Sequence, residues 1–255
     1  MRNLGQDVFG GTLVGKGGDR SPVALAGVLS TIKERSFSFD TPPQQIMARI
    51  LITSGPTRQY IDPVRYLTNA SSGRMGCSLA EAALAAGHDV VLVSGPVTVT
   101  YPAKAAVKWV TTTEEMLEAA REEFASCDGL IGVAAPCDYR PEFVQGQKIS
   151  KTGQPLVLEL IETPDIVATL GAEKGDRWVV GFALETEDRR FRALVKLEKK
   201  SCNLMVLNGP EAMNSDDNQV EVLAKDGSVV ASISGSKPEV ATQIVGIIDQ
   251  QLIHA

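Results

Sequence analysis

Short apolar runs alternate with helical patterns along the chain from about residue 49. Residues 50–53 are apolar and precede a Ser-Gly-Pro turn, which is typical of a buried strand. After a long loop, apolar residues recur at helical spacing from Met75 to Ala86, and Gly87 is a helix stop signal. Strands that alternate with helices predict a mostly parallel sheet with helices on both faces.

The same alternation continues to the C-terminus. Thr112 and Glu115 form a capping box that starts a helix, and Thr163 caps another with Pro in its first position. Asp226-Gly227 lies between two β-rich runs and predicts a tight hairpin. Further strands are predicted at 90–93, 130–134, 156–160, 178–182 and 204–207, and helices at 113–125, 164–170, 188–200 and 238–252. We therefore expect an α/β fold, a Rossmann-like three-layer sandwich with a mostly parallel sheet and a late β-hairpin.

The first 45 residues differ in composition from the rest. Glycines are frequent there, and the spacing of the pairs Gly10-Gly11 and Gly17-Gly18 matches neither a P-loop nor a dinucleotide fingerprint. We interpret residues 1–45 as a flexible N-terminal extension with room for a short helix at 23–33, followed by one domain over 46–255.

Composition excludes several classes of protein. The chain of 255 residues is 44% hydrophobic and 22% charged, which is typical of a soluble globular protein. It lacks an apolar run of the ~18 residues that a membrane-spanning helix needs, so we expect no membrane span. Its net charge of −6 argues against a general nucleic-acid surface, although a local basic pocket for a phosphorylated ligand remains open.

The cysteines and histidines narrow the chemistry further. None of the 4 cysteines forms a C-x-x-C pair, and the 2 histidines, His88 and His254, are far apart in the sequence. A structural zinc site and a histidine-based catalytic triad are therefore not expected. A secretory signal is not evident, so reduced cysteines in a cytoplasmic protein are the simplest interpretation.

Parallel sheets of this kind bind ligands at the carboxyl ends of their strands. The candidate segments are therefore 55–73, 134–151, 182–186 and 208–218. The first is too long for the G-x-G-x-x-G turn of a nicotinamide-dependent enzyme. It ends in Ser71-Ser72-Gly73 at a helix start, where N–H groups and hydroxyls either bind a phosphate or carboxylate or simply cap the helix.

Charged residues in these and nearby segments also allow more than one interpretation. Asp138 follows a strand, where it can accept ribose hydroxyls, help to hold a metal or form a turn. Cys137 has no histidine placed to activate it and is interpreted as a buried thiol. Lys148 lies in a polar loop that either closes over phosphates or is solvated. Lys196 and Lys200 lie four apart on a predicted helix, where like charges repel modestly unless an anion lies between them.

A set of short motifs occurs in a characteristic order. They are Gly55-Pro-Thr-Arg, Asp62-Pro-Val-Arg-Tyr, Asn69-x-Ser-Ser-Gly-x-Met-Gly, Ser94-Gly-Pro, Asp138-Tyr-Arg, Lys148-Ile-x-Lys, Pro164-Asp-Ile, Gly181-Phe-Ala-x-Glu-Thr and Asn214-Ser-Asp-x-Asn. Over residues 48–253 the chain resembles the phosphopantothenoylcysteine synthetase family, also called phosphopantothenate–cysteine ligases, of coenzyme A biosynthesis. In many bacteria this activity follows a flavin-dependent decarboxylase domain. About 45 residues are too few for such a domain, so a stand-alone ligase domain is expected.

The resemblance implies a defined reaction between 4′-phosphopantothenate and L-cysteine. In bacterial members of the family the carboxylate attacks the α-phosphate of CTP, which forms an acyl-cytidylate and releases pyrophosphate, and the cysteine amine then displaces CMP. Eukaryotic members tend to use ATP, and Mg²⁺ accompanies the nucleotide. The resemblance also implies a homodimer, with the late hairpin as a candidate for its interface, and allows a separate phosphopantothenoylcysteine decarboxylase as a partner.

Residue roles carry over position by position from this resemblance. Asn69 matches the asparagine that holds the substrate carboxylate and the acyl intermediate, and Lys148 matches a mobile-loop lysine linked to conversion of that intermediate. The expected nucleotide-binding positions are Ser71, Ser72, Gly73, Gly132, Val133, Ala134, Asp138, Lys148, Pro164, Asp165, Ile166, Val167, Phe182, Lys196 and Lys200. Without the resemblance, Phe182 would be assigned to the core. No metal ligand is identified.

Three places depart from the family pattern, namely Pro136-Cys137, Thr163 and Met213. The first lies beside the expected base pocket and bears on the choice of nucleotide. Two alternative functions are weighed against the ligase. A nicotinamide-dependent Rossmann oxidoreductase lacks its glycine fingerprint here. A non-catalytic nucleotide-binding protein would not need both residues that are expected to be catalytic.

Overall fold

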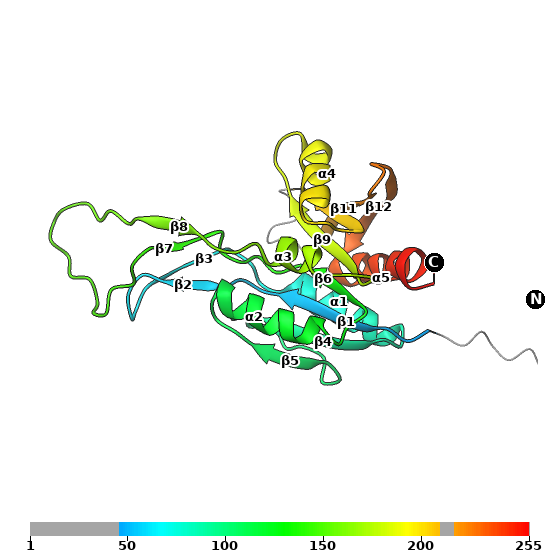
Figure 1. The fold of residues 1–255 in the computed structure, drawn as a ribbon, viewed down its shortest axis with the longest axis horizontal. Helices are drawn as coiled ribbons and strands as arrows, with labels where there is room; N and C mark the ends of the chain where they lie inside the picture. Colours follow the sequence, from blue (N-terminus) through cyan, green and yellow to red (C-terminus); the bar gives the residue numbers. More distant parts are fainter. Residues whose placement is uncertain (1–45, 210–216, 255) are drawn as a thin grey trace, which may run out of the picture. The chain divides into compact units, whose positions relative to one another are not determined.

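An eight-stranded sheet forms the centre of the structure, a computed structural model that describes residues 46–209 and 217–254 (Figure 1). In spatial order its strands are β12 (Val229–Ser236), β11 (Asp217–Ala224), β10 (Leu204–Asn208), β9 (Trp178–Leu184), β6 (Gly129–Gly132), β1 (Arg49–Ser54), β4 (Asp89–Ser94) and β5 (Ala106–Trp109). The strands from β10 to β5 run parallel to one another, and β11 and β12 form an antiparallel hairpin at the other edge. The predicted α/β fold with a mostly parallel sheet and a late hairpin is confirmed.

Helices cover both faces of this sheet and make it the middle of three layers. On one face lie α1 (Arg74–Ala85) and α5 (Lys237–Ile248), and on the other lie α2 (Thr113–Phe124), α3 (Ile166–Ala172) and α4 (Arg189–Lys199). Successive residues of β1 point to opposite faces, so Ile50 and Ile52 belong to the first core and Leu51 to the second. A π-helical turn, Asp249–Ile253, continues α5.

Local signals in the sequence account for two of these elements. The capping box before α2 is confirmed, because Thr112 Oγ1 accepts the N–H of Glu115 at 3.1 Å and the Glu115 carboxylate accepts the N–H of Thr112 at 3.1 Å. The turn between β11 and β12 contains Gly227 with φ 84°, a value that favours glycine, as the Asp-Gly pair predicts.

The start of α3 differs from the prediction. Its N-cap is Asp165, whose Oδ1 accepts a first-turn N–H at 3.0 Å, and the helix begins at Ile166. Thr163 is not the cap; its N–H donates to the Asp138 carbonyl at 2.9 Å and its hydroxyl to the Cys137 carbonyl at 2.6 Å. These bonds keep the chain extended for two residues longer than expected.

Strand predictions were also wrong in two places near the sheet. β6 ends at Gly132 and not at residue 134, because the chain turns away and Ala135 N–H bonds to the Gly55 carbonyl at 2.9 Å. β5, an edge strand with Trp109 exposed, was not predicted, because its side chains do not show the pattern of a buried strand.

Two small sheets extend to one side of the central sheet (Figure 1), and we call them, with their connecting segments, the arm (residues 58–68 and 139–162). In the arm β2 (Arg58–Tyr60) pairs with β3 (Tyr66–Thr68), and β7 (Tyr139–Pro141) pairs with β8 (Leu160–Glu162). The strand predicted at 156–160 is wrong, since β8 starts only at Leu160. Leu156 and Val157 are 56% and 83% exposed, so their apolar pattern does not mark a buried face.

None of the helices within the described ranges is long and apolar enough to cross a membrane. The 4 cysteines are free thiols, and burial raises the pKa of Cys127 and Cys202 to about 11. Cys137 is buried and its pKa is also raised by burial, which agrees with an unreactive thiol. The expected N-terminal extension with its helix at 23–33, and the departure at Met213, lie outside the described residues.

Candidate active site

A cavity of about 880 Å³ lies at the carboxyl ends of the parallel strands. Its walls come from the ends of β6, β9 and β10, the starts of α1 and α3, and the last turn of α4. Among the residues that sequence analysis selected, it brings together Asn69, Ser71, Ser72, Gly73, Gly132, Val133, Ala134, Asp138, Pro164, Asp165, Ile166, Val167, Phe182, Lys196 and Lys200. The volume is large enough for a nucleotide-sized ligand.

The start of α1 forms one wall of the cavity. Gly73, and not a serine, occupies the N-cap position, with φ 75°. Hydrogen bonds from the sheet hold this turn: Ser54 Oγ donates to the Gly73 carbonyl at 3.5 Å. The Tyr101 hydroxyl is hydrogen-bonded to Ser54 Oγ at 2.8 Å and to Ser94 Oγ at 2.7 Å. A Cβ on Gly76 would lie 2.0 Å from Ser54 Oγ, so this helix start sits directly on β1. The first N–H groups of such a helix favour an anion.

The segment after β6 forms a second wall, to which Asn69 is tied. Asn69 Nδ2 donates to the carbonyls of Pro136 at 2.9 Å and Ala135 at 3.3 Å. At the end of β6, a Cβ on Gly132 would lie 2.5 Å from Val167 Cγ2, so only glycine lets α3 approach this closely. The backbone of residues 132–136 therefore forms much of this side of the cavity.

Lys196 in the last turn of α4 and Lys200 at its C-cap, which we call the two α4 lysines, each lie against a carboxylate. Lys196 Nζ is 2.6 Å from Glu185 Oε1, and the Glu185 side chain is only 7% exposed. Lys200 Nζ is 3.1 Å from Asp165 Oδ2, on the residue that also caps α3. Because a charged group is buried only when it is paired, Glu185 gives Lys196 a defined position at the cavity.

Two further predicted residues have mixed environments. Phe182 lines the cavity and also packs against the core, so both interpretations of this residue hold in part. Asp138 lines the cavity where β7 begins and is exposed to solvent, while its carbonyl helps to fix Thr163. An exposed carboxylate at that position is available to a ligand.

The cavity also contains residues that the sequence analysis did not assign. Lys237, at the start of α5, donates to Asn218 Oδ1 at 3.2 Å, and both lie on the cavity wall with Asn208. Asn218 stands in one of the motifs, so a signal for it was present. Asn208 begins the candidate segment 208–218, whereas Lys237 carried no signal, since only the pairing of the late hairpin with β10 brings the start of α5 to the cavity.

Lys148 is not among the residues that line the cavity. It lies in the arm, in the segment 142–159 between β7 and β8, and its side chain is exposed. The two residues expected to be catalytic, Asn69 and Lys148, are thus on different parts of the structure.

Carboxylates around the cavity are dispersed. Asp138, Glu162 and Asp165 all line it, yet the residues that the structure describes contain no group of three or more His, Cys, Asp or Glu side chains placed to hold a metal ion. A metal held by protein side chains alone therefore has no preformed site in this part of the chain.

Comparison with known proteins agrees with this architecture. The family model described as DNA/pantothenate metabolism flavoprotein C-terminal domain matches residues 46–252. The chain belongs to this family. It is 40% identical over 195 residues to the Coenzyme A biosynthesis bifunctional protein CoaBC of Vibrio parahaemolyticus, which covers 74% of this chain and 49% of that protein. The protein of the same name from Vibrio cholerae is 39% identical over 222 residues, 84% of this chain and 55% of the relative.

As a member of this family, the chain spans about half the length of these curated relatives. A crystal structure of the C-terminal domain of Coenzyme A biosynthesis bifunctional protein CoaBC matches with a TM-score of 0.71 and 37% identity, over 83% of this chain and 100% of that domain. A Cab2 mutant in complex with phosphopantothenate-cysteine matches with a TM-score of 0.66 and 16% identity, over 81% and 88% of the two chains, and shares the fold.

Proposed function

We propose that this chain ligates 4′-phosphopantothenate to L-cysteine at the expense of a nucleotide, as a phosphopantothenate–cysteine ligase. The observation that carries the proposal is the cavity, which joins Asn69, the 71–73 turn and the two α4 lysines from separate segments. Two comparisons support it: the bifunctional relatives are named for coenzyme A biosynthesis, and a structural neighbour was solved with phosphopantothenate-cysteine.

In the first half-reaction, a carboxylate oxygen of phosphopantothenate attacks the α-phosphorus of CTP. A new P–O bond forms, the bond to the β-phosphate bridge breaks, and pyrophosphate leaves. Two polyanions must approach each other, so neutralisation and positioning are the main tasks of the protein. Lys196, Lys200 and the first turn of α1 offer positive charge and N–H groups around one cavity.

In this proposal Asn69 orients the reacting carboxylate without adding a charge. In this structure its Nδ2 group already donates to the carbonyls of Ala135 and Pro136. We infer that a bound carboxylate replaces one of these backbone acceptors. The amide then holds the acyl-cytidylate until the amine of cysteine attacks its carbonyl carbon, releases CMP and loses a proton.

The residues present fit a Mg²⁺ that enters with the nucleotide. Mg²⁺ is commonly held by one or two carboxylates together with substrate phosphates, and it neutralises phosphate charge when bound. Asp138, Glu162 and Asp165 line the cavity singly, which agrees with this mode better than with a cage of protein ligands.

CTP is the preferred nucleotide in this proposal, and ATP is the alternative. Residues 132–134 and Asp138 line the cavity, and in this proposal the backbone of 132–134 meets the edge of the base and Asp138 meets the ribose. Cys137, one of the departures from the family pattern, directs its Sγ towards the carbonyls of Thr57 and Leu67, at 3.5 Å each. The Cys137 thiol is therefore directed mainly towards Thr57, next to the arm, and Leu67 within it.

We expect the enzyme to be cytoplasmic and homodimeric, and a separate decarboxylase remains a candidate partner. The late hairpin is a candidate for part of the contact between copies: its Val220, Val222 and Ile233 are buried in the chain's own core, and Val229 is 37% exposed. In the arm, Phe143 and Val157 are 71% and 83% exposed. The arm is therefore a second candidate for the dimer contact.

A product assay tests the function directly. Purified protein would be incubated with Mg²⁺, 4′-phosphopantothenate and either CTP or ATP, with and without L-cysteine, and products identified by mass spectrometry. Pyrophosphate, CMP and phosphopantothenoylcysteine are expected with CTP. AMP in place of CMP would change only the nucleotide. Nucleotide binding by folded protein without any pyrophosphate would favour a binding protein, and nicotinamide binding would favour an oxidoreductase.

Asn69→Ala separates binding from chemistry. We expect it to bind nucleotide as the wild type does, because the α4 lysines and the α1 turn are unchanged, and to form product roughly 10²-fold more slowly. Isothermal titration with CTP and a steady-state assay measure the two quantities. Product formation at the wild-type rate would refute the role of Asn69.

A further inference from the structure

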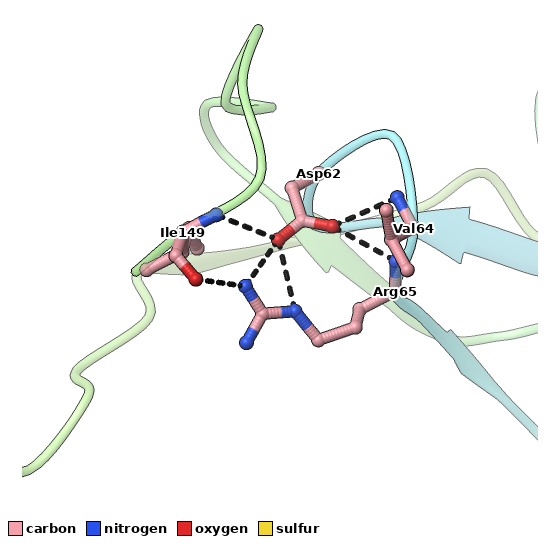
Figure 2. Close-up of polar contacts among 4 residues, drawn as sticks. All are labelled: Asp62, Val64, Arg65 and Ile149. Atoms are coloured by element: carbon pink, nitrogen blue, oxygen red, sulfur yellow. Dashed lines mark hydrogen bonds and ion pairs between the residues drawn. The ribbon is translucent and has the colours of Figure 1, made fainter. Parts of the chain in front are cut away.

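A buried carboxylate in the arm joins two segments that are far apart in the sequence. The side chain of Asp62, in the turn between β2 and β3, is 0% exposed. Figure 2 shows it surrounded by donors: Oδ1 accepts the N–H groups of Val64 and Arg65 at 2.9 Å each, and Oδ2 accepts Arg65 Nε at 2.9 Å, Arg65 Nη2, and the N–H of Ile149 at 3.1 Å.

The two oxygens of Asp62 have different tasks. Oδ1 bonds only within its own turn, as aspartate commonly does in turns. Oδ2 is directed to the Arg65 guanidinium and to Ile149, 87 residues later in the chain. A residue needed only for the turn would not require the second set of bonds.

Both backbone groups of Ile149 are held by this pair of side chains. Its N–H donates to Asp62 Oδ2, and its carbonyl accepts Arg65 Nη2 at 2.8 Å. A second tie lies four residues earlier, where Gln145 N–H donates to the Ile61 carbonyl at 3.0 Å. Lys148 lies between these two ties and immediately before the stronger one.

The remainder of the segment 142–159 has little else to hold it. Most of its side chains are exposed, and β7 and β8 pair only at its two ends. Charge-assisted hydrogen bonds to a fully buried carboxylate are stronger and more directional than neutral ones. The arginine beside it also holds the pKa of the Asp62 carboxyl well below its usual range, so the acceptor is present as the anion.

From this geometry we infer that Asp62 and Arg65 are positioning residues that fix the base of the Lys148 loop by clamping the backbone of Ile149. The inference rests on the proposed ligase function, in which Lys148 acts on the acyl-cytidylate. A lysine carried by a clamped backbone has a restricted path to the cavity, whereas release of Ile149 lets the loop sample many arrangements. The clamp should therefore affect the rate of the reaction and not the affinity for nucleotide.

Two substitutions open the clamp and leave the turn in place. Asp62→Asn keeps the Oδ1 acceptor but replaces Oδ2 by a donor, and Arg65→Gln removes the bond to the Ile149 carbonyl. Arg58→Gln is the matched control: it removes an arginine from the same hairpin, where the Arg58 guanidinium stacks on the Tyr66 ring at 4.6 Å.

We expect kcat to fall about tenfold in each clamp variant, since small misplacements of a catalytic group can cost up to 10²-fold. KM for the nucleotide should not change, and Arg58→Gln should match the wild type. Hydrogen exchange read by mass spectrometry should be faster in 142–159 in both clamp variants. In a Lys148→Gln background, Asp62→Asn should cause no further loss, because the residue it positions is already gone.

Several results would overturn the inference. Faster exchange in 142–159 with unchanged kcat would show that the clamp holds the loop but does not position Lys148. A full additional loss in the Lys148→Gln background would show that Asp62 acts independently of that lysine. Unchanged exchange would show that the clamp does not hold the segment. If one variant fails to fold, the other gives the same readouts. A wild type without ligase activity refutes the proposed function itself, and exchange then still reports on the clamp.

Discussion

The cavity and the arm hold their lysines in very different ways. At the cavity, Lys196 and Lys200 stand on a helix that packs on the central sheet, and each ammonium lies within 3.1 Å of a carboxylate. In the arm, Lys148 stands on an exposed segment whose backbone is fixed at a few points. Lys196 and Lys200 are held through their side chains, whereas Lys148 is positioned through the backbone of its neighbour Ile149.

This difference matches two different demands of a two-step ligation. A nucleotide must be bound with its phosphates in a fixed place, which favours residues on rigid elements. The acyl intermediate must be reached only after it has formed, which favours a group that moves in on a loop. Substitution of the two cavity lysines should therefore change the affinity for nucleotide, and substitutions in the arm should change the rate.

Lys148→Gln is the strongest test of this contrast. Loss of a well-placed charge next to the developing anion should lower the single-turnover rate by roughly 10²–10³-fold. Nucleotide affinity and thermal stability should stay at wild-type values, because the Lys148 side chain is exposed and does not line the cavity. Rapid-quench measurements with and without cysteine would show which half-reaction is slowed.

Lys104→Gln is the control, since it removes the same charge from an exposed position outside both the cavity and the arm. It should behave as the wild type. If Lys148→Gln kept its rate but lost nucleotide affinity, the contrast between arm and cavity would be wrong.

Replacing a cavity lysine by glutamine should have the opposite effect, on KM and not on kcat. Lys196→Gln should raise KM for the nucleotide about tenfold, the order of one charge-assisted contact to phosphate, with little change in kcat. It should also lower the free energy of unfolding by about 1–3 kcal/mol, because Glu185, 7% exposed, would be left buried without its counter-charge. Urea titration and steady-state kinetics measure the two effects.

Lys200→Gln separates these two consequences. Its partner Asp165 is 41% exposed and can be solvated when the lysine is removed. It should therefore raise KM as Lys196→Gln does but leave the unfolding midpoint in place. Equal destabilisation by both substitutions would show that burial of Glu185 is not the cause.

The cavity was largely predictable from the sequence, and the arm was not. Residues 50–53 form a continuous apolar run because β1 is covered on both faces, and the helix from Met75 has a periodic pattern because one of its faces packs on the sheet. β2 and β3 are three residues long, and their one buried side chain is the polar Gln59, so no such pattern exists for them. In the arm, the alternation at Leu156 had the appearance of a strand and misled the prediction for that reason.

Partnerships across the chain were beyond sequence reasoning for a related reason. The rule that ligands bind at the carboxyl ends of parallel strands selected segments that the structure brings together at the cavity, since the rule depends only on the order of elements. The pairing of Glu185 with Lys196, and of Asp62 with Ile149, depends on the path of the backbone between them. Neither Asp62 nor Glu185 was selected individually, although both stand in motifs.

The clamp in the arm should be insensitive to pH across the working range of the enzyme. Arg65 and the surrounding N–H groups lower the pKa of the Asp62 carboxyl, whereas an unfolded aspartate titrates near pH ~3.9. A depressed folded-state pKa gives stability that is fully present above the unfolded pKa and is lost as pH falls through the folded one. Between about pH 5.5 and 8.5 the carboxylate is ionised in both the folded and the unfolded state, so the contribution of the clamp to stability does not change with pH.

The ratio of kcat between wild type and Asp62→Asn should therefore be constant over this range. A protonated Asp62 would resemble asparagine, so a ratio that falls towards one at the acidic end would mean that Asp62 titrates there and that the arginine does not hold it as an anion.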